Sequence, residues 1–253
     1  MSADVARGVP DEVMAKVADV DGWMSPGQAA RLYAAAAATR PGQQIVEIGS
    51  FRGRSMIVMA SAAPEGVSLV AIDPHAGNDR GPQEIEGFVA EADDDNKVFL
   101  SNLERAGVAH RVRHVREFSD AAHGHVDGAV AVLYVDGAHR FAPARADIRD
   151  WGARVAPGGT LLIHDSFSSV GVTLAILREL LLGNRFRYVG RSRSLAEYRA
   201  DLDGTGRSRA VNALRQAVQL GWFAKNLLVK VVMSLRGGPL LERLTGRPAE
   251  WPY

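Results

Sequence analysis

The sequence has no cysteine among its 253 residues. This absence excludes disulfide bonds, thiolate metal sites and a cysteine nucleophile, and it is typical of a protein from a reducing compartment. No apolar run reaches the roughly 18–20 residues of a membrane span, so we expect no transmembrane segment. The first residues, MSADVARGVPDEV, also lack the apolar run of a secretory signal, which predicts a cytoplasmic location.

An excess of charge of one sign is also lacking. Lys plus Arg (30) nearly balance Asp plus Glu (29), so we expect no nucleic-acid partner. Lysine is scarce, whereas arginine and alanine are abundant, a bias typical of GC-rich actinobacterial genes. Apolar residues make up 47% and charged residues 23%, which is the composition of a globular protein with a buried core.

Short apolar runs alternate with helical patterns between Ile45 and Tyr198. The runs IVEIG, LVAID, RVRHV, AVLYVD and TLLIHD are apolar enough for strands buried on both faces, and FRYV and SLAEYR indicate a closing antiparallel pair. The intervening segments with helical patterns are Ser55–Ala63, Asn96–Ala106, Pro143–Val155 and Val170–Leu182. The sequence therefore predicts an α/β fold with a Rossmann-like, doubly wound, mostly parallel seven-stranded sheet. Its ligands are expected beyond the carboxyl ends of the strands.

Helical additions flank this predicted sheet. Ser25 and Pro26 open a helix, because serine caps and proline suits the first turn, so residues 1–40 are expected to form an N-terminal helical cap. Residues 41–200 form the expected catalytic domain, and residues 201–253 a C-terminal extension with one helix over Ala210–Leu235. The apolar positions of that helix are expected to pack on its own domain or in a homodimer. The acidic segment Gly77–Asn96 is a candidate lid.

A glycine-containing turn follows the first predicted strand. It reads Glu47-Ile48-Gly49-Ser50-Phe51-Arg52-Gly53, and glycines here let the backbone approach a ligand closely. An acidic residue before the glycines is suited to a ligand's ammonium group. Asp73 closes the next strand, where a carboxylate can accept both hydroxyls of a ribose.

Two further polar clusters follow neighbouring strands, Asp136-Gly137-Ala138-His139 and His164-Asp165. Both are expected at the same edge of the sheet. Asp136 and Asp165 offer the oxygen ligands that a divalent cation such as Mg²⁺ needs, although Asp136 can also simply line the cleft. His139, with an imidazole suited to proton transfer near neutral pH, is the candidate general base.

The turn and the strand-two acid resemble the E-x-G-x-x-x-G motif of class I S-adenosylmethionine (SAM)-dependent methyltransferases. This resemblance implies that Glu47, Gly49, Ser50 and Gly53 line the methionine end of SAM. It also implies that Asp73 binds the ribose and that Ser119 lies beside the adenine.

The clusters DGAH and HD resemble those of metal-dependent O-methyltransferases that modify sugars in macrolides and polysaccharides. The resemblance implies Asp136 and Asp165 as ligands of Mg²⁺ or Mn²⁺ and His139 as the base. This chain departs from that pattern at His164, which replaces the first member of an acidic pair. As a metal ligand His164 would suit Mn²⁺, Fe²⁺ or Zn²⁺ better than Mg²⁺. Alternatively, water or another acid from the loop takes the place of the missing carboxylate.

The expected function is a SAM-dependent, divalent-metal-assisted O-methyltransferase. Its small-molecule or oligosaccharide acceptor would offer a sugar hydroxyl, as in a glycoside or a mycobacterial methylmannose or methylglucose polymer. The alternatives are an O-methyltransferase of a catechol-like molecule, a non-catalytic SAM-binding protein and a nicotinamide-dependent oxidoreductase. The glycine spacing, which is not GxGxxG, argues against the last.

Overall fold

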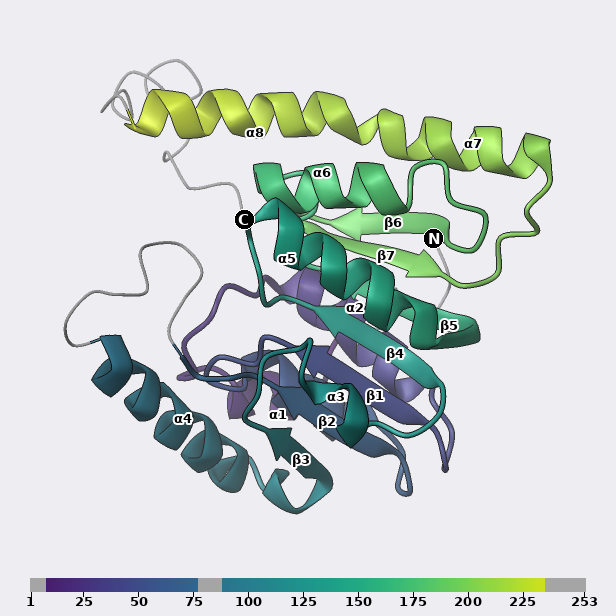
Figure 1. The fold of residues 1–253 in the computed structure, drawn as a ribbon. Helices are drawn as coiled ribbons and strands as arrows, with labels where there is room; N and C mark the ends of the chain where they lie inside the picture. The colour runs from purple at the N-terminus through teal and green to yellow at the C-terminus, as the bar shows by residue number, and fades with distance from the viewer. Residues whose placement is uncertain (1–7, 77–87, 235–253) are drawn as a thin grey trace.

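The computed structural model describes residues 8–76 and 88–234 and shows helices on both faces of a central sheet (Figure 1). The sheet has seven strands in the order β3-β2-β1-β4-β5-β7-β6, parallel from β3 to β5 and antiparallel at β7 and β6. This confirms the predicted Rossmann-like α/β architecture. The strands are β1 (Gln44–Ile48), β2 (Ser68–Ile72), β3 (Val112–Val115), β4 (Val130–Val135), β5 (Val155–Ile163), β6 (Arg187–Ser192) and β7 (Leu195–Arg199).

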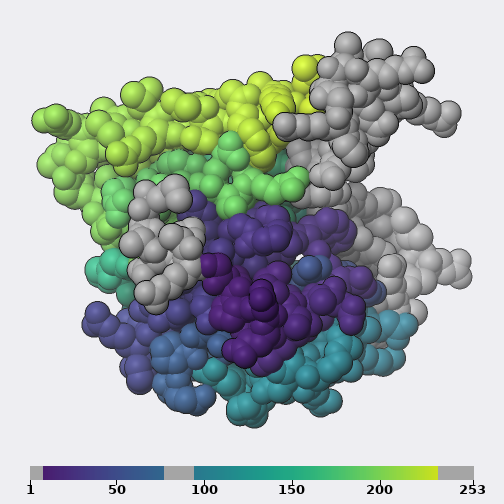
Figure 2. Space-filling model, turned by 180° about the vertical axis from the view of Figure 1, so that it is seen from behind, coloured from purple at the N-terminus to yellow at the C-terminus, as the bar shows by residue number. Residues whose placement is uncertain are grey.

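The helices divide between the two faces because successive strand residues point to opposite sides. Ile45 of β1 packs with the helices α1 to α4, whereas Val46 packs with α5 and α6. Figure 2 shows the N-terminal helices, in purple, lying across the first of these faces. The first layer comprises α1 (Asp11–Lys16), α2 (Pro26–Ala37), α3 (Arg54–Ala62) and α4 (Phe88–Arg105), and the second includes α5 (Phe141–Ala146) and α6 (Val170–Glu179).

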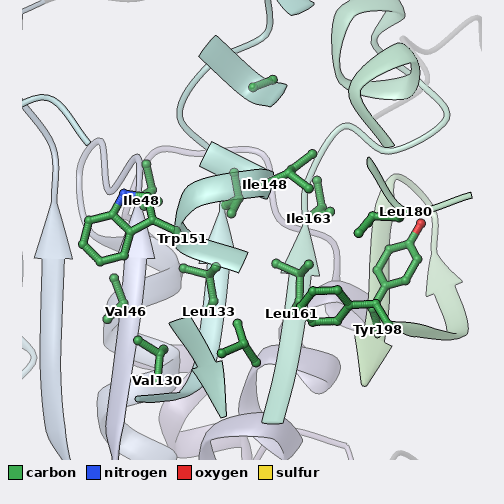
Figure 3. Close-up of a cluster of buried hydrophobic side chains, with 14 of the residues drawn as sticks. Val46, Ile48, Val130, Leu133, Ile148, Trp151, Leu161, Ile163, Leu180 and Tyr198 are labelled. Carbon is green, nitrogen blue, oxygen red and sulfur yellow. The ribbon is translucent and has the colours of Figure 1, made fainter. Parts of the chain in front are cut away.

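The second face holds a core of aliphatic and aromatic side chains (Figure 3). Leu133 and Leu161, from neighbouring central strands, lie in this core together with Trp151, which follows α5. All six residues of β4 are buried, which explains why its sequence is almost continuously apolar. The strands that end at the candidate site are therefore held rigidly from both faces.

One predicted helix is not a regular α-helix. The segment Pro143–Val155 was expected to be helical throughout, but α5 ends at Ala146 and a π-helical turn covers Asp147–Trp151. A short 3-10 turn follows, and β5 already begins at Val155. Apolar residues recur here at helical spacing, but this spacing does not distinguish an α-helix from a π-helical turn, which holds about one more residue per turn.

The C-terminal part also differs from the single helix expected over Ala210–Leu235. It forms two helices in line, α7 (Gly206–Ala217) and α8 (Gln219–Ser234), which lie over α6 and the β6–β7 pair (Figure 1). Trp222 and Phe223 of α8 pack against the core of the second face. None of the helices within residues 8–76 and 88–234 is long and apolar enough to cross a membrane.

The candidate lid falls mostly outside the described residues. Residues 77–87 are not described, and the chain from Phe88 onward belongs to α4. The predicted lid therefore stays a prediction for its first part, while its second part is the start of a helix.

Candidate active site

The turn after β1 is held in a conformation that requires glycine. Gly49 and Gly53 have φ angles of 86° and 85°, in the left-handed region. A Cβ atom on Gly49 would lie 2.5 Å from the carbonyl oxygen of Asp136, so the ends of β1 and β4 approach each other closely here. Gly53 caps the start of α3. The predicted glycine positions therefore shape the backbone between two strand ends.

Asp73 fixes this turn through its carboxylate. Its Oδ2 accepts hydrogen bonds from the backbone N–H groups of Ser50 and Phe51, both at 2.8 Å, and its Oδ1 accepts one from His75 N at 2.8 Å. Asp73 and Ser50 both line the cleft at this edge of the sheet. The strand-two acid thus lies where the sequence predicts, and it also organises the turn that precedes it.

Glu47 is buried beneath the protein surface rather than exposed at the wall of a cleft. It is completely buried, and Ser55 Oγ donates a hydrogen bond to its Oε1. Burial raises the pKa of Glu47 to about 8, because water is excluded from the charged form. Its Oε2 has no hydrogen-bond partner among the described residues. A cationic group brought close to Glu47 would satisfy that oxygen.

A cleft of about 510 Å³ opens above the turn and beside the end of β4. It is large enough for a nucleoside-sized ligand together with part of an acceptor. Trp23, which precedes α2, stacks on Phe51 at one side with ring centroids 6.0 Å apart. The predicted site residues that line this cleft are Gly49, Ser50, Asp73, Ser119, Asp136, His139 and His164.

Two acid–imidazole pairs meet at the carboxyl ends of β4 and β5. His139 Nε2 lies 2.7 Å from Asp165 Oδ2, and His164 Nδ1 lies 3.0 Å from Asp136 Oδ1. The sequence placed these four residues at one edge, and the structure brings them together in pairs that spacing alone does not indicate. Asp165 is buried, whereas His139 is partly exposed in the cleft.

Hydrogen bonds fix the tautomer of His164. Ser25 N donates to Gln28 Oε1 at 2.7 Å, so the amide nitrogen of Gln28 is the atom that faces His164 Nε2 at 3.3 Å. Nε2 must then accept, and Nδ1 carries the proton that bonds to Asp136. Tyr134 donates a further hydrogen bond to Asp136 Oδ2 at 2.6 Å, and burial raises the pKa of this hydroxyl well above its usual range.

The two acid–imidazole pairs include all three predicted metal ligands. Asp136, His164 and Asp165 bond to neighbouring side chains, and no group of three or more His, Asp or Glu residues in the described part of the chain is arranged around a common cation position. The proton on His164 Nδ1 faces the carboxylates of Asp136 and Asp165, at 3.0 and 3.8 Å. As arranged, this donor set does not fit a cation.

Residues 46–166 match a family model described as a methyltransferase domain, a range that contains both the glycine turn and Asp165. Over this range the sequence is similar to methyltransferase domains.

Solved structures resemble this chain in fold. The cofactor-bound Rv0187 from MTB has a TM-score of 0.50 at 17% identity, with 77% of this chain and 91% of that chain covered. The O-methyltransferase NovP has a TM-score of 0.52 at 14% identity, with 69% and 79% covered. At these identities the likeness shows the fold alone.

A curated relative, the uncharacterized protein y4gI of Sinorhizobium fredii, is 27% identical over 132 residues. The match covers 51% of this chain but only 14% of the length of that relative. About half of this chain is therefore similar to a small part of a much longer protein.

Ser119 is paired with an acid that the sequence did not single out. Ser119 Oγ donates to Asp147 Oδ1, and both residues line the cleft. Burial raises the pKa of Asp147 to about 6. The π-helical turn begins at Asp147, and no local sequence signal marks it, because the turn keeps the apolar spacing of an ordinary helix.

Gln28 and Tyr134 were also missed. Gln28 lies in α2, far from β5 in the chain, and reaches both His164 and Ser194 Oγ, the latter at 3.1 Å. Tyr134 was interpreted only as part of a buried strand, although its hydroxyl bonds to Asp136. The Ser-x-x-Gln spacing of Ser25 and Gln28 is the sequence signal that could have singled out Gln28, but such spacing is typical of a helix start rather than of a site.

Proposed function

We propose that this chain transfers a methyl group from SAM to a hydroxyl oxygen, with a sugar as the acceptor. The observation that carries the proposal is the pairing of His139 with Asp165 at the cleft that the glycine turn and Asp73 also line. An imidazole oriented by a carboxylate is the arrangement of a general base, and general-base catalysis is what a hydroxyl acceptor requires. The similarity in fold to NovP, an O-methyltransferase, supports oxygen as the acceptor atom.

The proposed reaction needs a base rather than an activated donor. The sulfonium of SAM is already reactive, whereas an aliphatic hydroxyl keeps its proton at neutral pH. As the new O–C bond forms and the S–C bond breaks, the hydroxyl proton passes to His139. Nε2 of His139 contacts Asp165, whose carboxylate would stabilise the imidazolium that results. Nδ1, the other ring nitrogen, is buried in this structure, so the ring must move for this atom to reach the acceptor.

The side chains around the cleft support a polar acceptor. Asp21, Arg52, Asp95 and Arg140 line it, and the aromatic side chains of Trp23, Phe51, Phe118 and Tyr134 also stand at its wall. A polyol offers the hydroxyl groups that such carboxylates and guanidinium groups bind. A glycoside or a precursor of a methylated polysaccharide has this chemistry.

The divalent cation stays a separate prediction. The carboxylates of Asp136 and Asp165 are suitable donors for a hard ion, but their pairing with His164 and His139 leaves no step of the mechanism to assign to a cation. Calorimetric titration of Mg²⁺ and Mn²⁺ into metal-stripped protein tests this directly. A heat that disappears in Asp165→Ala would support the cation, and no heat in the wild type would contradict it.

Titration of SAM and S-adenosylhomocysteine tests the donor site, and methyl transfer from isotopically labelled SAM to a panel of sugars and catechols tests the acceptor. We expect micromolar binding and label in a sugar. His139→Gln should lower kcat by about 10²–10⁴-fold while leaving the SAM dissociation constant unchanged. The matched control is His110→Gln, because His110 is an exposed histidine outside the cleft.

The outcomes separate the alternatives. Label in a catechol instead of a sugar would contradict the proposed acceptor class but would not contradict the role of His139 as the base. Binding of SAM without transfer to any acceptor would favour a SAM-binding protein without catalysis. Folded protein that binds neither SAM nor S-adenosylhomocysteine would refute the whole proposal.

A further inference from the structure

The loop after β5 is buried and conformationally strained. Asp165 and Phe167 have φ angles of 53° and 56°, a region that non-glycine residues rarely adopt. The side chains from His164 to Ser168 are all buried. Such a conformation persists only where the surrounding structure imposes it, so the contacts of this loop determine where Asp165 points.

Two of these contacts come from α8. Asn226 Nδ2 donates to the carbonyl oxygen of Phe167 at 3.1 Å, and Lys230 Nζ donates to the carbonyl oxygen of Ser168 at 2.9 Å. Asn226 and Lys230 are four residues apart and therefore on the same face of the helix. Asn226 is only 2% exposed, and a buried amide is stable in a helix only where it is hydrogen-bonded.

The same loop is joined to the segment that carries His139. Besides the contact of Asp165 with His139 Nε2, Ser169 Oγ donates to the backbone carbonyl of His139 at 3.2 Å. Gly171, at the start of α6, lies so close that a Cβ atom there would be 2.3 Å from the same carbonyl oxygen. A displacement of the loop would therefore displace His139 as well.

We propose that Asn226 and Lys230 are positioning residues for the His139–Asp165 pair. Through the carbonyl groups of Phe167 and Ser168, α8 holds the loop in the conformation that directs Asp165 at His139. The C-terminal helix is in this way part of the catalytic unit rather than an appendage to it. The inference rests on the proposed function, in which His139 is the base.

The test observes the pair itself rather than turnover. In ¹⁵N-histidine-labelled protein, the proton between His139 Nε2 and Asp165 should give a downfield resonance, assigned by its loss in His139→Gln. Asn226→Leu and Lys230→Met should each weaken or abolish it and make amide exchange at Ser168 and Ser169 about tenfold faster. The dissociation constant of SAM should stay within about twofold of wild type. Lys225→Met is the matched control, since Lys225 is exposed on the same helix.

A resonance and exchange rates unchanged in both variants would overturn the positioning role but leave the proposed function intact. Absence of the resonance from the wild type would overturn the pair and, with it, the base assigned above. If Asn226→Leu does not fold, the resonance and the exchange rates of Lys230→Met alone decide whether α8 positions the pair.

Discussion

Glu47 combines two properties that oppose each other in the absence of a ligand. Its carboxyl group is fully buried at the end of β1, where ionisation is unfavourable, yet it is the acid that the sequence assigns to a ligand's ammonium group. A ligand cation would favour the charged form that burial disfavours. The same residue should therefore lower the stability of the free protein and raise its affinity for SAM.

Glu47→Gln tests both effects. The raised pKa means that native Glu47 keeps its proton from the ordinary value of 4.5 up to about 8, whereas the unfolded chain loses it. The free energy of unfolding of the wild type should therefore fall as pH rises through this window, by about 5 kcal/mol at most. Glu47→Gln, which keeps an acceptor for Ser55, should lack this fall and melt several degrees higher at pH 8.

The binding measurement supplies the second half of that test. SAM should bind Glu47→Gln roughly tenfold or more weakly at pH 8, because the charged partner of the ammonium group is gone. Glu104→Gln, at an exposed position of α4, is the control and should change neither property. Equal melting temperatures of Glu47→Gln and wild type at pH 8 would refute the burial argument.

At the scale of elements, the start of α6 is packed against the backbone that carries His139. A Cβ atom at Gly171 would meet three backbone atoms of His139, Arg140 and Phe141 within 2.8 Å, and backbone cannot rotate away as a side chain can. The helix α6 can therefore pack this closely only because residue 171 has no Cβ atom.

Gly171→Ala should destabilise the protein by about 1–3 kcal/mol and lower the rate of methyl transfer at least tenfold, with little change in SAM affinity. Gly221→Ala in α8 is the matched control, because a Cβ atom there meets nothing within 4 Å and alanine favours helix. The control should be neutral or stabilising in thermal unfolding. Gly171→Ala with the melting temperature and rate of the control would contradict the packing argument.

Elements were easier to predict from the sequence than the contacts between them. The parallel strands are evident in the sequence because burial on both faces leaves almost uninterrupted apolar runs. Most predicted site residues also line the cleft, and the exceptions are Glu47, Gly53 and Asp165. The π-helical turn at Asp147 and the break at Val218 could not be predicted, because both keep helical apolar spacing. The pairing of His139 with Asp165 depends on loop conformation, which residue spacing does not encode.

On the scale of the whole molecule, α7 and α8 leave apolar side chains in contact with solvent. Val211, Leu214 and Val218 are 45%, 66% and 66% exposed and recur at helical spacing along α7, and Leu228 of α8 is 64% exposed. Exposed apolar stripes of this kind are typical of surfaces that pair with another chain. The homodimer predicted from the sequence stays a prediction, and this stripe is where we expect it to form.

Sedimentation or light scattering should give twice the mass of 27.2 kDa for the wild type. Leu214→Glu combined with Val218→Glu should halve that mass without lowering the melting temperature of the monomer, because both side chains point to solvent. Val189→Glu on β6 serves as the control for an added charge at an exposed apolar position. A monomeric wild type would contradict the dimer.

The position of β7 has a consequence for synthesis. Among the strands of the described residues, β7 is the last to leave the ribosome, yet it lies between β5 and β6 in the sheet. A nascent chain that has just completed β5 at Ile163 therefore exposes an unpaired strand edge until Arg199 has emerged, on the order of seconds at cellular rates of translation. Open strand edges recruit other chains, so the growing polypeptide is most prone to aggregation during this interval.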